Sequence, residues 1–336
     1  MAKVKCILLL LIALAGCQAN EPTATAIPAT TPELPAGFDV QGHRGARGLK
    51  PENTLPAFET ALDLGVTTLE LDLHLTADGV VVIWHDDRIT KDKCGLAEGG
   101  SADAPNPDDL AAASDALMIS RLTFAQIQSY RCDRNPDAGA FPAQNNEPTA
   151  LAGDTYHVAS LEELFQFVDE YSQSDLKSET QRANASAVMF NMETKRKANE
   201  PEVINDGFDG QNPGPFEMEI LRLLETYAVK DRSVVQSFDY RSLWAIRSVD
   251  DTIRLAALTS RGKADIAEFA QNGADIWSPN YNMLTAELVK TAHQNNMQVI
   301  PWTVNEPAAM LDLIAMGVDG IISDRPDILL DLQIEK

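Results

Sequence analysis

The chain has 336 residues, of which 44% are hydrophobic, enough for one large domain or two domains of ordinary size. Fifty acidic residues against 27 Lys and Arg give a formal net charge of −23 at pH 7. So acidic a chain argues against a nucleic-acid groove or an anionic membrane surface as its partner. A small anionic ligand would need a locally positive or metal-bearing site.

Residues 1–16 have the pattern of an export signal that is later removed. Lys3 and Lys5 precede the apolar run CILLLLIALAG, which is short for a bilayer span, and Cys17 follows it. The letters LAGC resemble the bacterial lipobox, in which cleavage before the cysteine leaves that residue carrying lipid. An ordinary secretory signal with an incidental cysteine is the alternative. We expect an exported lipoprotein, held to a membrane through Cys17 on the periplasmic face or the cell surface.

The rest of the chain divides into a tether and a folded domain. Residues 17–37 are rich in Pro, Thr and Ala and lack the apolar periodicity of a packed element, which predicts a flexible tether. From residue 38 to 336, short apolar runs alternate with amphipathic helical patterns, which is typical of βα units around a parallel sheet. The predicted strands end near Gly42, Leu75, Glu193, Ser237, Leu258, Ser278, Trp302 and Ser323. The helical patterns cover residues 54–65, 160–171, 217–229, 240–249, 264–273, 285–296 and 307–317.

Eight strands, with a helical pattern after each of the first seven, predict a TIM (β/α)8 barrel over residues 38–336. A doubly wound open sheet is the alternative, but no G-x-G-x-x-G follows the first strand. The βα rhythm is interrupted by residues 88–157, which are polar and Pro-rich, with one predicted helix near 122–130. We expect this segment to be an insertion after the hairpin of the second strand.

Two cysteines, Cys94 and Cys132, lie inside the insertion and remain once the signal and the anchor are set aside. In an oxidising compartment we expect them to form a disulfide, which contributes roughly 3 to 5 kcal/mol in the chain-entropy model. Two free buried thiols are the alternative. Zinc is not expected, because no further Cys or His lies at ligand spacing nearby.

Polar residues lie at or beyond the ends of the first two predicted strands, and the active site of a TIM barrel lies at the carboxyl ends of its strands. His43 and Arg44 follow the first strand. In TLELDLHL, strand alternation places Glu70, Asp72 and His74 on one face and the leucines on the other. Two carboxylates inside a barrel repel each other unless a cation lies between them, so we expect a metal site rather than the solvated face of an edge strand. His74 lies further along, and we expect it to pack or to support the site from behind.

Later strands bring further polar side chains to the same region. In VVIWHDD, His85 ends the hairpin partner of the second strand, and in VMFNMETK, Glu193 and Lys195 share one face. Lone histidines are usually structural, but His43 and His85 both flank the carboxylates, which favours an acid/base role. Lys195 is expected either to pair with Glu193 or to anchor an anionic substrate. The remaining histidines outside this group, expected on the surface or in helices, are His157 and His293.

The run HRGARGLKPENTLPAFETALDLGVTTLELDLHLTADGVVVIWHDDRIT closely resembles the glycerophosphodiester phosphodiesterases, here of a bacterial exported lipoprotein type. The resemblance continues through VASLEELF, FNMETK, VVQSFDY, PWTVN and GIISDRPD, from about Val40 to the end, with residues 88–157 the least typical part. It implies a TIM barrel and metal-dependent hydrolysis of glycerophosphodiesters to glycerol 3-phosphate and an alcohol.

By position, the resemblance also implies roles for individual residues. It makes Glu70, Asp72 and Glu193 the metal ligands, His43 and His85 the acid/base pair, and Arg44 and Lys195 the phosphate contacts. Met192 and Thr194 stand where the family usually has apolar residues, on either side of the glutamate. Strand parity points both away from the pocket, so this departure leaves the site intact. Three carboxylate ligands favour one calcium or magnesium ion as cofactor.

The expected partner is a small glycerophosphodiester, with no nucleic acid. Trp302, at the end of a late strand, is expected to pack against the glycerol or head group, or else to belong to the core at the barrel top. No Ser, Thr or Cys lies at a motif position beside either histidine, so the attacking group is expected to be water or a hydroxyl of the substrate itself. The resemblance favours the substrate's own hydroxyl, through a cyclic phosphate that water then opens.

Two other functions compete with this prediction. A lysophospholipase D would use the same residues on lysophospholipids, and the predicted membrane anchor makes that plausible. A surface lipoprotein that only binds a ligand is the other, but a pure binder has no use for two acid/base histidines.

Overall fold

The computed structural model of the chain describes Met1 and residues 34–109 and 114–332. Apart from Met1, the predicted export signal lies outside the described residues, as do residues 17–33 of the predicted tether, which include Cys17. Within the described ranges, no helix is both long enough and apolar enough to cross a membrane.

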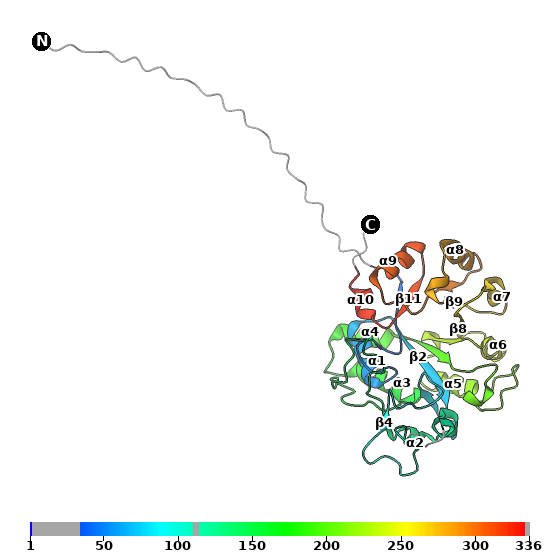
Figure 1. Ribbon diagram of the computed structural model, residues 1–336. Coiled ribbons are helices and arrows are strands. Elements are labelled where there is room, and N and C mark those ends of the chain that lie inside the picture. The colour runs from blue at the N-terminus through cyan, green and yellow to red at the C-terminus, as the bar shows by residue number, and fades with distance from the viewer. Residues whose placement is uncertain (2–33, 110–113, 333–336) are drawn as a thin grey trace.

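The fold is a barrel of eight parallel strands (Figure 1). In chain order these are β1 (Asp39–Gly42), β2 (Thr68–Leu75), β6 (Met189–Thr194), β7 (Ser233–Ser237), β8 (Arg254–Thr259), β9 (Ile276–Pro279), β10 (Gln298–Val299) and β11 (Gly320–Ser323). They pair in the order β10, β9, β8, β7, β6, β2, β1, β11. The barrel closes where the N–H of Asp319 donates to Val299 O (2.9 Å) and that of Ile322 to Pro301 O (3.0 Å). The predicted TIM barrel is confirmed, and the open sheet is wrong.

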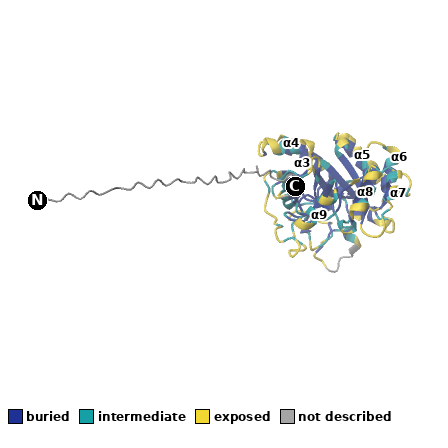
Figure 2. Ribbon diagram, turned by 90° about the horizontal axis from the view of Figure 1, so that it is seen from above, coloured by how far each residue is buried: buried dark blue, intermediate teal, exposed yellow. Residues whose placement is uncertain are grey.

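Side chains alternate between the two faces of the barrel wall, as the sequence pattern predicts. Along β2, Leu69, Leu71 and Leu73 are buried in the core that the helices cover, while Glu70 and Asp72 take the opposite face, inside the barrel. In Figure 2 the strands form a dark blue centre, and the helices around it are exposed on their outer sides. A second, smaller core fills the barrel interior and consists of Val234, Ala256, Ile276, Ile300 and Ile322.

Helices surround the barrel at the positions that the apolar periodicity predicts. They are α1 (Leu55–Leu64), α3 (Leu161–Gln173), α5 (Pro215–Thr226), α6 (Tyr240–Val249), α7 (Ile266–Gln271), α8 (Ala286–Gln294) and α9 (Pro307–Met316). Side-chain caps fix the N-termini of several helices: the Thr54 side chain accepts a hydrogen bond from Ala57 N–H at the start of α1, and Ser160 and Glu163 form a capping box at the start of α3. Short 3-10 turns occupy Ser114–Leu117, Ile119–Arg121, Pro201–Val203, Lys230–Arg232 and Tyr281–Met283.

Two helices and one strand end differ from the prediction. Helix α4 (Glu179–Ala187) buries only Ala185, so its sequence carries no apolar stripe that would reveal it, and α10 (Pro326–Leu330) is too short to show a period. The strand expected to end near Trp302 ends at Val299. The chain nevertheless stays beside β9, since Trp302 N–H donates to Pro279 O.

The insertion forms a lobe with its own small core. Strand β3 (Val81–Ile83) pairs antiparallel with β2, and β4 (Gly95–Leu96) with β5 (Tyr130–Arg131). The predicted helix is present as the single turn α2 (Phe124–Ile127). Cys94 and Cys132 form the predicted disulfide. Around it pack the buried side chains of Trp84, Ile89, Leu117, Ile119, Leu122, Ile127, Tyr130 and Val158.

Candidate active site

A pocket of about 280 Å³ opens at the carboxyl ends of the barrel strands. Its wall holds His43, Arg44, Arg47, Glu70, His85, Glu193, Lys195, Gln236, Phe238, Leu258, Trp302, Thr303 and Ile322. The predicted site residues therefore converge on one cavity. Asp72 lies directly beneath this wall, with Lys195 Nζ 3.4 Å from its Oδ1.

Three buried carboxylates form the floor of the pocket. Glu70, Asp72 and Glu193 each offer one oxygen, and these oxygens lie within 4.8 Å of one another, because β2 and β6 pair with Asp72 opposite Glu193. Burial and the neighbouring Asp72 raise the pKa of Glu70 well above its usual value. Burial also raises the pKa of Glu193, although Lys195 opposes the shift. Burial alone would raise the pKa of Asp72, but Lys195 and Arg44 hold it well below its usual range. The cluster thus concentrates like charge where a cation would relieve it.

The donor set fits a hard divalent cation. Hydrogen bonds orient two of the carboxylates: Gln236 Nε2 donates to Glu70 Oε1 (2.7 Å), Arg44 N–H to Glu70 Oε2 (2.9 Å), and Asn53 Nδ2 to Asp72 Oδ2 (2.8 Å). Both carboxylates can still accept a further interaction. Asp72 Oδ1, fully buried, accepts no hydrogen bond from the described residues. A buried carboxylate oxygen that accepts no hydrogen bond, beside two other carboxylate oxygens, is suited to calcium or magnesium, which take oxygen ligands. These residues could hold a metal ion, as the sequence predicts.

His43 stands at the end of β1 with its ring clamped on one side. Its Nδ1 lies 2.5 Å from Asp324 Oδ1, and its Nε2 faces the pocket, 3.9 Å from Glu70 Oε2. Burial lowers the pKa of His43 to about 4, more than Asp324 raises it. Burial works the other way on Asp324, yet His43 and Arg47 hold the pKa of that carboxyl well below its usual range. A neutral ring beside an ionised carboxylate carries its proton on Nδ1, which leaves Nε2 free to accept one.

His85 approaches the pocket from the hairpin that follows β2. Its Nδ1 lies 2.8 Å from Asp86 Oδ1, and its side chain is 32% exposed, against 11% for His43. His74 is fully buried behind it, with Nε2 3.5 Å from the carbonyl of His85, and burial lowers its pKa to about 4. His74 is therefore a packed, supporting residue, as expected. The other two histidines lie away from the pocket: His157 is beside Glu163, and His293 is beside Asp319.

The two predicted phosphate contacts are both tied to carboxylates. Arg44 Nη1 lies 3.0 Å from Glu52 Oε2, and its Nε lies 3.2 Å from Asp72 Oδ2. Lys195 Nζ lies 2.9 Å from Glu193 Oε1. Burial lowers the pKa of Lys195, but Glu193 and Asp72 outweigh it and raise the value to about 12, so the lysine stays charged in the pocket wall. Both alternatives for Lys195 are thus compatible with its position.

An apolar wall faces the charged one. Trp302 donates from Nε1 to Ser278 O (2.9 Å), and its ring meets Phe238 edge-on with centroids 5.5 Å apart. Trp302 also packs against the core inside the barrel, so it belongs to the barrel top and to the pocket lining at once. Such a wall suits the carbon skeleton of a substrate.

Several residues of the site escaped sequence reasoning. Asp324 follows the end of β11, so the rule that flagged His43 at a strand end could have flagged it too. Gln236 shares the inward parity of β7. Glu52 and Lys93 carry no local signal, because their importance lies only in their contacts with residues distant in sequence.

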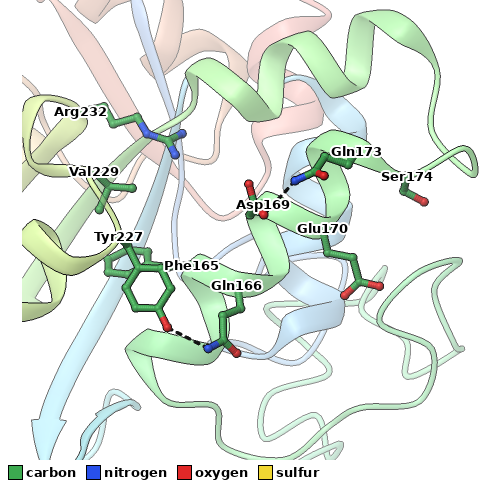
Figure 3. A pocket seen from close by; sticks show the side chains of 9 residues that line it. All are labelled: Phe165, Gln166, Asp169, Glu170, Gln173, Ser174, Tyr227, Val229 and Arg232. Atoms are coloured by element: carbon green, nitrogen blue, oxygen red, sulfur yellow. Dashed lines mark hydrogen bonds between the residues drawn. The ribbon is translucent and has the colours of Figure 1, made fainter.

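A larger crevice lies outside the barrel, and its size is misleading. It measures about 460 Å³ between α3 and the connection from α5 to β7. Figure 3 shows Gln166 and Tyr227 turned toward each other in it, with Asp169 beside Gln173. Among the described residues that line it, Arg232 is the one cation, and it donates to backbone carbonyls at the end of α4; none of these lining residues is a histidine. The crevice lacks the groups that phosphodiester chemistry needs.

Comparison with known proteins agrees with this geometry. The sequence pattern of the glycerophosphoryl diester phosphodiesterase family matches residues 43–328. A glycerophosphodiester phosphodiesterase of Caldanaerobacter subterraneus is 26% identical over 87% of this chain and 96% of its own. A Silicibacter pomeroyi protein assigned as a glycerophosphoryl diester phosphodiesterase superposes with a TM-score of 0.70 at 28% identity, covering 89% of this chain and 95% of the other. An Oleispira antarctica phosphodiesterase, solved with sn-glycerol-3-phosphate, has a TM-score of 0.62 at 18% identity, over 88% of this chain and 96% of its own. The chain therefore belongs to the glycerophosphoryl diester phosphodiesterase family.

Proposed function

We propose that the protein hydrolyses glycerophosphodiesters to glycerol 3-phosphate and an alcohol, with one calcium or magnesium ion bound by Glu70, Asp72 and Glu193. The observation that carries the proposal is a single pocket in which two histidines and three cationic side chains, Arg44, Arg47 and Lys195, surround a buried cluster of three carboxylates. Relatives along most of the chain are named glycerophosphodiester phosphodiesterases, which supports the same activity.

The charged wall addresses the main obstacle to the reaction. A phosphodiester is an anion and repels nucleophiles, so positive charge beside its oxygens lowers the barrier. Arg44 and Lys195 supply that charge from fixed positions in the pocket wall. The chemistry supplied by a bound divalent ion is further stabilisation of negative charge on the phosphate. The apolar wall around Trp302 would orient the glycerol or head group.

The histidines divide the proton transfers between two steps. Thr303 is the sole aliphatic hydroxyl residue among the described residues that line the pocket, and it forms no hydrogen bond to either histidine there. The attacking group is then water or the substrate itself, and the family resemblance favours the glycerol hydroxyl on the carbon next to the phosphoester. One histidine takes its proton as the oxygen bonds to phosphorus, and the other protonates the departing alcohol, leaving a cyclic phosphate. Water opens the ring with the roles of His43 and His85 exchanged.

The activity is tested by comparing two substrates. We expect glycerophosphocholine to be hydrolysed to glycerol 3-phosphate and choline, faster than lysophosphatidylcholine is cleaved, both measured by mass spectrometry of the products. Preferential cleavage of lysophosphatidylcholine would identify a lysophospholipase D. Binding of either compound without turnover, in the presence of calcium or magnesium, would contradict the proposal that the protein is an enzyme and would favour a ligand-binding lipoprotein.

Replacement of either histidine removes an acid/base group from both steps. His43→Ala and His85→Ala should each slow turnover by about 100-fold or more. His293→Ala, at the exposed end of α8, is the control and should leave turnover unchanged.

An analogue with hydrogen in place of the neighbouring hydroxyl should resist the wild-type enzyme. If it is hydrolysed as fast as glycerophosphocholine, water attacks directly and there is no cyclic phosphate.

The metal is tested by removing charge from the cluster. Wild-type enzyme treated with a strong chelator should lose activity and regain it with calcium or magnesium, and elemental analysis should find one ion per chain. Glu70→Gln, Asp72→Asn and Glu193→Gln should each abolish that recovery, because each removes an anionic ligand. Glu287→Gln, exposed on α8, is the control. Full activity in chelator, with no metal bound, would refute a catalytic ion.

We propose further that the chain is exported and anchored to a membrane by lipid on Cys17, on the strength of the LAGC motif and the apolar run before it. Cys17→Ser should abolish labelling by a radioactive fatty acid and release the protein from membranes, while the activity of the released domain stays close to wild type. Labelling that persists in Cys17→Ser would refute the anchor.

A further inference from the structure

The insertion delivers one lysine to the edge of the catalytic pocket. Lys93 Nζ lies 2.8 Å from Glu52 Oε1 and 2.6 Å from Asp86 Oδ2, and the side chain is only 13% exposed. The ammonium group also lies 5.4 Å from the centroid of the Trp84 ring. Two carboxylates from different segments thus share a single, largely buried cation, although Lys93 itself does not line the pocket.

Each of these carboxylates holds a residue of the site with its other oxygen. Asp86 Oδ1 lies 2.8 Å from His85 Nδ1, and Glu52 Oε2 lies 3.0 Å from Arg44 Nη1. Burial would raise the pKa of Glu52, but Arg44 and Lys93 lower it to about 2, so the carboxylate is charged. Lys93 therefore stands at the junction of a chain of contacts that runs from an acid/base histidine to a phosphate-binding arginine.

The turn that bears Lys93 is fixed from both sides. Cys94 N–H and Lys93 N–H both donate to Thr90 O, at 2.9 and 3.2 Å, and the Cys94–Cys132 disulfide ties the turn to β5. Beyond the disulfide, Arg134 N–H donates to Lys93 O (3.1 Å). The ammonium group is thus held by a covalently closed part of the insertion rather than by a free loop.

We propose that Lys93 is a positioning residue: it fixes Asp86 and Glu52, and through them the orientation of His85 and the guanidinium of Arg44, and the disulfide holds Lys93 in place. The inference rests on the proposed function. Without the ammonium, Asp86 and Glu52 would lose the cation that lies between them, and their mutual repulsion would move them apart. An angstrom-scale displacement of a catalytic group is costly to turnover. A lysine that served only stability would leave the turnover of folded enzyme unchanged.

The test compares Lys93→Met with a matched control, Lys91→Met, an exposed lysine of the same segment. With glycerophosphocholine as substrate, Lys93→Met should lower kcat by about 10-fold or more, and Lys93→Arg should restore most of it. Lys91→Met should match wild type. Because Lys93 acts on His85 through Asp86, Asp86→Asn combined with Lys93→Met should cost less than the product of the two single effects.

The outcomes separate the inference from the function on which it rests. Wild-type enzyme that does not hydrolyse glycerophosphodiesters overturns both. Active wild type together with folded Lys93→Met of unchanged kcat overturns the inference alone, as do fully multiplicative effects with Asp86→Asn. If Lys93→Met does not fold, reduction of the disulfide in wild-type enzyme decides: kcat should fall and recover on reoxidation. Unchanged kcat in fully reduced, folded enzyme would refute the role given to the disulfide.

Discussion

The arrangement of the site depends on the burial of three carboxylates at the mouth of the barrel. Glu70, Asp72 and Glu193 are almost inaccessible to water and close enough to repel one another strongly. The fold compensates with Arg44 and Lys195 around the cluster and with amide donors behind it. A cluster of this kind is too costly for a purely structural role, because apolar side chains fill a barrel at least as well. A divalent cation, bound as proposed, would relieve this repulsion.

The two histidines are supported by different parts of the chain. His43 is supported by Asp324, which follows β11, and Arg47 and Asn305 donate hydrogen bonds to that carboxylate. His85 is more exposed and depends on groups outside the eight strands. One histidine of the proposed acid/base pair is therefore held by Asp324, whereas the other is held by Asp86, which in turn contacts Lys93 of the insertion.

Much of the fold and of the site could be predicted from the sequence, because period-2 alternation on the strands and the helical period reflect burial directly. The alternation in β2 was enough to place Glu70 and Asp72 inside the barrel. What had no period could not be predicted: α4 buries one side chain, and α10 has five residues. The insertion could be recognised from its polar composition and its two cysteines. Its small core around the disulfide could not be predicted, because the residues that form it follow no regular period in the sequence.

The sequence by itself determined the elements, the face that each polar residue takes, and the kinds of side chain available for chemistry, since these depend on local periodicity and residue type. Only the tertiary structure decided which of those side chains share a partner. Asp324 meets His43 across 281 positions of the chain, and Lys93 meets Glu52 across 41. Such pairs are set by strand register, barrel closure and the attachment of the insertion. These three features depend on packing between distant segments, and the local sequence of one segment does not indicate which other segment it will pack against.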